Sequence, residues 1–189
     1  MTVNSTGYWG EVTATIDWCE HNYTLTKYLA EFWNSVSSLV ILVLGLAGAL
    51  LARRRHLEHR YIWLNFAVAV VGFGSFMFHG TMRFGWQLWD EIPMIYAALV
   101  WLFVWLEAPW LTMRRSWLVA IMASYAVLWT TLHAVYGFVV AFQANFGIMQ
   151  ALGMLYTMYA MTQTRSPIVY WLGHMYVWSF FVGIFLWSI

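Results

Sequence analysis

Oxygen-bearing side chains crowd one stretch near the amino terminus. Within residues 17–22 the sequence carries two carboxylates and an amide, and a third carboxylate follows shortly after: Asp17, Glu20, Asn22 and Glu31. Such hard oxygen donors are the ligands that Ca²⁺ prefers, about six to eight at a time. Their spacing differs from that of a helix–loop–helix calcium hand. The stretch therefore predicts either a calcium-binding loop or a polar loop that caps the following helix.

A second stretch joins a hydroxyl to an imidazole. Ser75 and His79 are four residues apart, so on a helix they share one face. Gly72 and Gly74 just before them would let a neighbouring helix or a substrate approach the backbone closely. This pattern indicates metal ligation by His79 with oxyanion stabilisation by Ser75, or else a hydrogen-bonded buried pair.

A third stretch places the acidic pair Asp90 and Glu91 shortly before Pro93. This order is typical of a helix amino terminus, with proline in the first turn and carboxylates favoured by the helix dipole. The two carboxylates point in different directions on a helix, so one can cap while the other faces the interior. If Asp90 lies near His79, it could act as a general base or support a metal-bound histidine.

Two further histidines stand alone in apolar sequence, His133 and His174. We interpret both as structural. An alternative is a membrane haem protein with His79 and His133 as axial ligands. An absorbance spectrum without a Soret band would exclude it.

The composition defines the surroundings of these residues. Of 189 residues, 62% are hydrophobic and 9% are charged, against about 45–50% and about 25% in soluble domains. So few charges exclude a soluble enzyme, and a net charge of +1 provides no field for nucleic acid. The single cysteine, Cys19, excludes an intrachain disulfide. We expect an all-α, multi-span membrane protein.

Six windows are apolar enough to cross a bilayer, which takes about 20 residues. The third is short unless it extends back through Asp90 and Glu91. Brief polar connectors predict an up-and-down helix bundle formed by residues 29–189, preceded by an outer segment, residues 1–28. The windows are Leu29–Ala52, Tyr61–Phe78, Ile92–Leu106, Trp117–Tyr136, Phe138–Ala160 and Tyr170–Ile189.

Basic residues predict the orientation of these spans. Seven arginines fall in the connectors of one side, whereas the other side has only Lys27 and Arg83, which places the amino terminus outside, in a lumen or the extracellular space. Asn4 and Asn22 match the glycosylation pattern that an outside amino terminus permits. Several ionisable residues then gather in the outer layer, and ionisable residues within a membrane indicate function. They are Asp17, Glu20, Glu31, His79, Asp90 and Glu91.

The sequence resembles the alkaline ceramidases, seven-span membrane amidases that hydrolyse the amide bond of ceramides. Four ordered motifs in the first three-fifths of the chain carry the resemblance, and the later spans match only as apolar helices. The motifs are Gly-Tyr-Trp-Gly at 7–10 with Thr-Ile-Asp-Trp-Cys-Glu at 15–20, Tyr-Leu-Ala-Glu-Phe-Trp-Asn at 28–34, Gly-Phe-Gly-Ser-Phe-Met-Phe-His at 72–79 and Leu-Trp-Asp-Glu-Ile-Pro-Met-Ile-Tyr at 88–96.

The resemblance implies a role for each site residue. His79 would be one ligand of a zinc ion that supplies a nucleophilic water, Ser75 would stabilise the oxyanion, and Asp90 would assist proton transfer. It also implies a ceramide-type substrate and a location in the endoplasmic reticulum or Golgi. A calcium ion would be held by Asp17, Trp18 through its carbonyl, Glu20, Asn22 and Glu31.

The sequence departs from the family pattern at the second half of the zinc site. The family completes that site with a His-x-x-x-His pair in a seventh span, and no such pair occurs in these 189 residues. We therefore expect a fragment or truncated product that is inactive as written. The alternative is a non-catalytic sphingolipid-binding or regulatory membrane protein.

Overall fold

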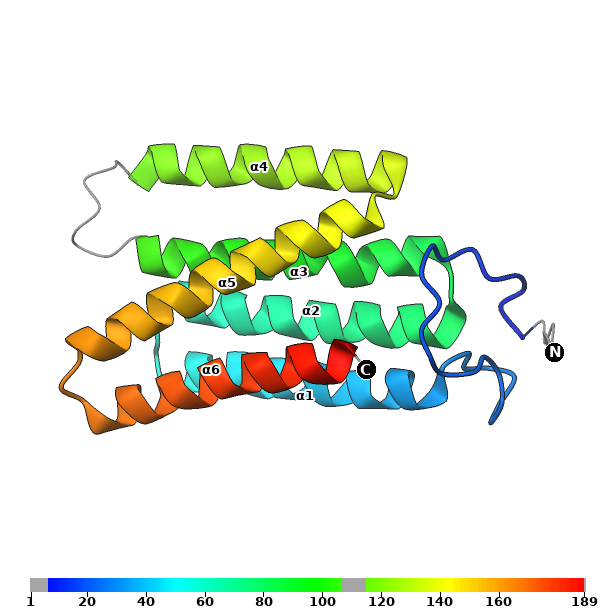
Figure 1. Cartoon of the computed structure of the whole chain (residues 1–189), viewed down its shortest axis with the longest axis horizontal. Helices are drawn as coiled ribbons and strands as arrows, with labels where there is room; N and C mark the ends of the chain where they lie inside the picture. The colour runs from blue at the N-terminus through cyan, green and yellow to red at the C-terminus, as the bar shows by residue number, and fades with distance from the viewer. Residues whose placement is uncertain (1–6, 107–114, 189) are drawn as a thin grey trace. The chain divides into compact units, whose positions relative to one another are not determined.

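A computed structural model of the chain describes residues 7–106 and 115–188 (Figure 1). Within these residues β pairing is limited to two isolated bridges, and the rest of the regular structure is helical. The predicted all-α fold is therefore confirmed. Its helices are α1 (Phe32–Arg54), α2 (His59–Thr81), α3 (Phe84–Leu106), α4 (Arg115–Tyr136), α5 (Val139–Gln163) and α6 (Pro167–Ser188).

Each of the six helices is long and apolar enough to cross a membrane. Large apolar side chains on them are exposed, for instance Leu44 at 65%, Val127 at 65% and Trp178 at 66%. Such surfaces are stable in contact with lipid chains and costly in water. The chain is thus a multi-pass membrane protein. The predicted boundary between the outer segment and the helix bundle, at residue 28, remains a prediction. The predicted glycosylation site at Asn4 lies outside the described residues.

Five helices lie close to the predicted windows, but α3 begins at Phe84 instead of Ile92. Asp90 and Glu91 consequently lie inside the helix, and Pro93 is an interior proline. The prediction that this pair marks a helix amino terminus is therefore wrong. The start of α3 is capped from elsewhere in the sequence, because the Phe84 N–H donates to the hydroxyl of Thr13 at 3.0 Å.

The chain forms two compact units, Met1–Phe142 and Gln143–Ile189. The second unit holds most of α5 and all of α6, joined by residues 164–166. In it the Tyr176 hydroxyl donates to Gln150 Oε1 at 3.5 Å, and the His174 ring packs edge-on against Tyr170. All the polar groups discussed below belong to the first unit.

In the first unit α2 packs between α1 and α3, and glycines allow the close approach. A Cβ on Gly72 would lie 2.3 Å from the backbone nitrogen of Leu42 in α1. On the other side, a Cβ on Gly74 would lie 2.0 Å from the carbonyl oxygen of Trp89 in α3. These contacts set the register of the three helices around Ser75 and His79. The predicted bend at Gly137 is also present, with a φ of 58° between α4 and α5.

Candidate functional site

The amino-terminal segment, residues 7–31, lies over one end of the first unit, where α2 ends and α3 begins (Figure 1). It is tied there by backbone hydrogen bonds. Met82 ends α2 in a left-handed conformation, and its carbonyl accepts from the N–H groups of Thr13 at 3.0 Å and Ala14 at 3.1 Å. The Glu31 N–H donates to the carbonyl of His79 at 3.0 Å. The segment is therefore a fixed part of the site.

A small apolar core anchors this segment. Burial raises the pKa of the Tyr23 hydroxyl above its ordinary value, and the charge of Arg83 partly opposes that effect. Tyr23 therefore stays neutral at physiological pH as part of this core. The core consists of Ala30, Phe78 and Met82, with Ala14, Trp18, Tyr23 and Trp86 packed around them.

Glu20 caps the amino terminus of α1. Its two carboxylate oxygens accept from the backbone N–H groups of Trp33 at 2.9 Å and Asn34 at 3.0 Å. The first N–H groups of a helix have no partner within the helix, and the helix dipole favours a negative charge there. The capping interpretation of the loop is thus confirmed. Elsewhere in the loop, Asn22 Nδ2 donates to Asp17 Oδ1 at 3.0 Å.

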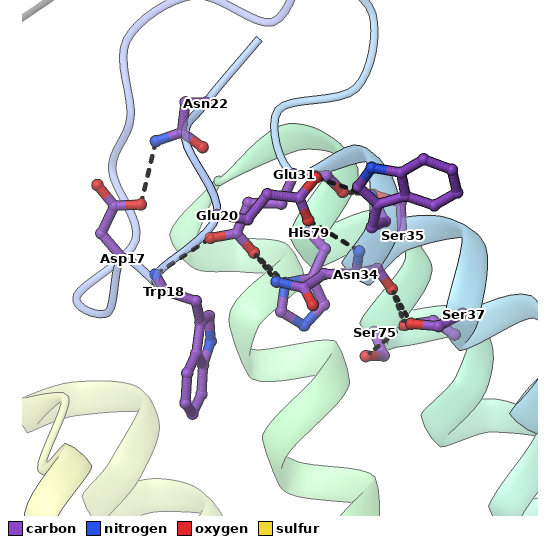
Figure 2. A network of polar contacts seen from close by, with 12 residues as sticks. Asp17, Trp18, Glu20, Asn22, Glu31, Asn34, Ser35, Ser37, Ser75 and His79 are labelled. Carbon is purple, nitrogen blue, oxygen red and sulfur yellow. Dashed lines mark hydrogen bonds and ion pairs between the residues drawn. The ribbon is translucent and has the colours of Figure 1, made fainter. Parts of the chain in front are cut away.

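Glu31 is the centre of the polar network (Figure 2). Its side chain is fully buried, with an exposed fraction of 0%. Oε1 accepts from the Trp18 N–H at 3.1 Å, while Oε2 accepts from Asn34 Nδ2 at 3.0 Å and contacts His79 Nδ1. A buried carboxylate is costly unless several donors satisfy it. Glu31 thereby fixes the orientation of the His79 ring.

Ser75, His79 and Asp90 meet beside this carboxylate. Ser75 and His79 lie one helical turn apart on α2, and the Ser38 hydroxyl donates to Ser75 Oγ at 3.0 Å. Asp90, on α3, lies close enough to Ser75 for a polar interaction and interacts electrostatically with His79. The condition under which Asp90 could assist His79 is therefore met. The trio combines a hydroxyl donor, an imidazole and a carboxylate, which suits acid–base chemistry at a carbonyl group.

The donor sets match the two expected metals in different ways. For zinc, Glu31 engages Nδ1 of His79 and leaves Nε2 for a metal, which is the usual carboxylate–histidine arrangement. For calcium, Asp17, Glu20 and Glu31 offer hard oxygens in one segment, although each already accepts a hydrogen bond. Among residues 7–106 and 115–188, no three His, Cys, Asp or Glu side chains converge on one metal position.

A second histidine–glutamate pair was not foreseen from the sequence. Glu91 Oε2 lies 2.5 Å from His133 Nε2, and Glu91 Oε1 accepts from Gln87 Nε2 at 3.2 Å. Gln87 and Glu91 are four residues apart, a spacing that could have indicated their contact once a helix was assigned there. Nothing in the sequence pairs His133 with Glu91.

Comparisons with known proteins agree on one family. The sequence model of the Ceramidase family matches residues 10–189. Alkaline ceramidase 3 of Mus musculus is 35% identical over 188 residues, covering 99% of this chain and 70% of that protein. Alkaline ceramidase of Arabidopsis thaliana is 29% identical over 191 residues, covering 99% and 72%. Alkaline ceramidase YPC1 of Saccharomyces cerevisiae is 42% identical over 94 residues, covering 50% and 30%.

Proposed function

Because the chain belongs to the ceramidase family, we propose that it acts in hydrolysis of the ceramide amide bond, releasing a sphingoid base and a fatty acid. The observation that carries this proposal is the meeting of Ser75, His79 and Asp90 beside the buried Glu31. Amide hydrolysis needs a donor for the developing oxyanion and a group that moves protons. Both are present at this end of the first unit.

Each side chain has a distinct role in the proposed reaction. The Ser75 hydroxyl donates a hydrogen bond to the amide oxygen as negative charge develops there. The Asp90 carboxylate holds the proton that must reach the amide nitrogen as the bond breaks. Glu31 orients His79 through Nδ1 so that Nε2 faces the site. Zinc, when bound, would supply Lewis-acid chemistry and lower the pKa of a water molecule to about 7.

A catalytic zinc takes about three protein ligands, and the described residues contribute His79. No His-x-x-x-His pair occurs in the sequence, and His133 is engaged with Glu91. We infer that these 189 residues alone do not complete a catalytic zinc site and are inactive by themselves. The protein to assay is therefore the full gene product, including any sequence that follows residue 189 in the gene.

We propose that the amino-terminal segment also binds Ca²⁺. The ligands would be Asp17, Trp18 through its carbonyl, Glu20, Asn22 and Glu31. A calcium ion would replace the hydrogen bond between Asn22 and Asp17 and share the carboxylates of Glu20 and Glu31. Since Glu31 also contacts His79, an ion at this position would restrict the motion of the His79 side chain. Calcium should raise the thermal midpoint of the purified protein, Mg²⁺ should not, and Asp17→Asn should remove the response.

We further propose that the site faces the lumen of the endoplasmic reticulum or Golgi. The bias of arginines toward the opposite connectors supports this orientation. An epitope tag at the amino terminus should resist protease in sealed microsomes and become sensitive after detergent is added. Cleavage of the tag in sealed microsomes would reverse the orientation.

Release of labelled fatty acid from ceramide tests the activity. Detergent-solubilised full gene product should release the label, and a zinc chelator should abolish the release until Zn²⁺ is restored. His79→Ala should be inactive, whereas His174→Ala, a histidine outside the site, should match the parent. Folded, zinc-loaded protein that releases no label would overturn the proposal. If such protein still bound ceramide, the non-catalytic sphingolipid-binding alternative would replace it.

A further inference from the structure

A buried polar cluster joins α3 to α4 beside the candidate site. We call it the α3–α4 clasp and define it as Thr15, Gln87, Glu91 and His133. Gln87 Oε1 accepts from the Thr15 N–H at 2.8 Å, and Gln87 Nε2 donates to the Thr15 hydroxyl at 2.8 Å and to Glu91 at 3.2 Å. Glu91 Oε2 then meets His133 Nε2 at 2.5 Å. The clasp thus links the amino-terminal segment, α3 and α4.

The helix side chains of the clasp are almost inaccessible. The exposed fractions are 0% for Gln87, 5% for Glu91 and 1% for His133. Leaving a buried glutamate without its partner strongly destabilises the folded protein. The contact with His133 therefore keeps the Glu91 side of α3 facing α4. On its other side the His133 ring packs against Phe142, with ring centroids 5.0 Å apart. The polar bonding of His133 among the described residues is therefore directed at Glu91.

The first part of α3 needs such a constraint because Pro93 weakens the helix there. Proline has no N–H, so the Trp89 carbonyl four residues earlier lacks its helical hydrogen bond. That same carbonyl lies against Gly74 of α2. The turn that carries Asp90 is therefore held by a backbone contact with α2 on one side and by the clasp on the other.

We propose that the α3–α4 clasp positions Asp90 against Ser75 and His79. Neighbouring residues on a helix point about 100° apart, so fixing Glu91 toward α4 also fixes Asp90 toward α2. Glu91 and His133 do not touch the reacting groups and act through Asp90. The proposal rests on the hydrolytic function proposed above, because the carboxylate that it positions has its role there.

Loss of the clasp should lower the reaction rate strongly, although its residues do not touch the substrate. A displacement of about 1 Å at a catalytic group can cost about a hundred-fold in rate. Substrate binding, in contrast, depends on apolar surface that the clasp does not provide. Loss of the clasp should therefore lower kcat and leave KM nearly unchanged.

Kinetics of the full gene product test this split. His133→Leu removes the donor to Glu91, whereas His133→Gln keeps an N–H near the position of Nε2. Per folded molecule, His133→Leu should lower kcat at least ten-fold, and His133→Gln should restore most of it. His174→Gln is the matched control and should behave as the parent. An unchanged kcat in His133→Leu, or a change confined to KM, would overturn the proposal.

Disulfide cross-linking tests the positioning without any activity. In a Cys19→Ser background, Ser75→Cys with Asp90→Cys should form a disulfide readily under mild oxidation, since α2 and α3 approach closely at the neighbouring Gly74 and the two side chains lie near each other. Adding His133→Leu should slow its formation several-fold, and His133→Gln should restore the rate. An unchanged rate would overturn the clasp proposal even if ceramide proved not to be the substrate. Should His133→Leu not fold, Gln87→Met breaks the same cluster, and its kcat, its KM and its rate of disulfide formation are measured instead.

Discussion

Two histidine–glutamate pairs lie at the same end of the first unit, yet they leave opposite ring nitrogens without a carboxylate. Glu31 contacts Nδ1 of His79, whose side chain is 13% exposed, and Asp90 interacts electrostatically with the same imidazole. Glu91 meets Nε2 of His133, whose side chain is 1% exposed, and Nδ1 has no hydrogen-bond partner among the described residues. The first pair can present a metal ligand, whereas the second is enclosed.

The difference shows that the same two residue types can form an accessible pair in one place and an enclosed pair in another, depending on their surroundings. Glu31 reaches His79 from the residue just before α1, and the His79 side chain keeps an exposed fraction of 13%. Glu91 and His133 face each other from two helices, and Phe142 packs against the imidazole. An identical pair of side chains thus indicates chemistry in one place and helix packing in the other.

The largest effect should come from removing the open histidine. His79→Ala should lower ceramide hydrolysis by at least about a hundred-fold, because even residues that support a metal ligand contribute about 10–100-fold. Bound zinc should fall in parallel, measured by elemental analysis of the purified full gene product. His133→Gln, which replaces the histidine of the closed pair, should keep its zinc. Equal zinc loss in both variants would contradict the distinction between the pairs.

Neutralising the partner of the open histidine should have the next largest effect. Glu31→Gln keeps the shape but removes the charge that orients His79, so activity should fall about 10–100-fold. The calcium-dependent rise in thermal midpoint should disappear in the same variant. Glu11→Gln, at an exposed acid of the same segment, serves as the control. Full activity in Glu31→Gln would show that the contact with His79 is only structural.

Replacing Gly74, where α2 contacts α3, should lower the stability of the folded protein. Gly74→Ala places a Cβ 2.0 Å from the Trp89 carbonyl oxygen, so α2 and α3 must separate. Overpacking of this kind costs about 1–3 kcal/mol. Gly85→Ala is the matched control, since an added Cβ there meets nothing within 4 Å. Thermal unfolding in detergent measures both variants, and equal midpoints would contradict the close packing of α2 on α3.

The smallest effect should come from the helix cap. Glu20→Ala leaves the N–H groups of Trp33 and Asn34 without their acceptor, which should cost about 0.5–2 kcal/mol. Glu11→Ala removes an acid of the same segment that caps no helix in the structure, and its midpoint should match that of the parent. If both variants unfold alike, the Glu20 carboxylate contributes little to the end of α1 beside the first pair.

Much of the fold is predictable because long apolar runs can form only helices in a membrane. The start of α3 is the exception, since polar residues such as Gln87 and Asp90 look like a connector. Gln87 bonds to Thr15 and Asp90 lies near Ser75, while the N–H of Phe84 donates to Thr13, and all three partners are far away in the sequence. Local pattern cannot reveal that a polar residue will be satisfied by tertiary contacts.

More of the first histidine–glutamate pair and its neighbours is predictable from the sequence than of the second pair. The motif spacing places Ser75 and His79 on one face, and the resemblance assigns Asp90 to the same reaction. It assigns Glu31 only to calcium, so the contact of Glu31 with His79 is not predicted. The link between Glu91 and His133 depends on how α3 rotates toward α4, which follows from the Gly74 contact and the earlier helix start. Neither quantity is encoded in a short stretch of sequence. The sequence predicts that the loop of residues 17–22 can cap the following helix, but it does not single out Glu20, because the N–H partners of Glu20 lie 13 and 14 residues ahead.

The placement of the two pairs also bears on how the protein assembles during synthesis. Glu31 and His79 are 48 residues apart and join the start of α1 to the end of α2, while Glu91 and His133 are 42 apart and join the first part of α3 to the end of α4. Each pair therefore closes one helical hairpin. Since chains fold from the amino terminus as they emerge from the ribosome, the hairpin that joins Glu31 to His79 can close before the hairpin that joins Glu91 to His133.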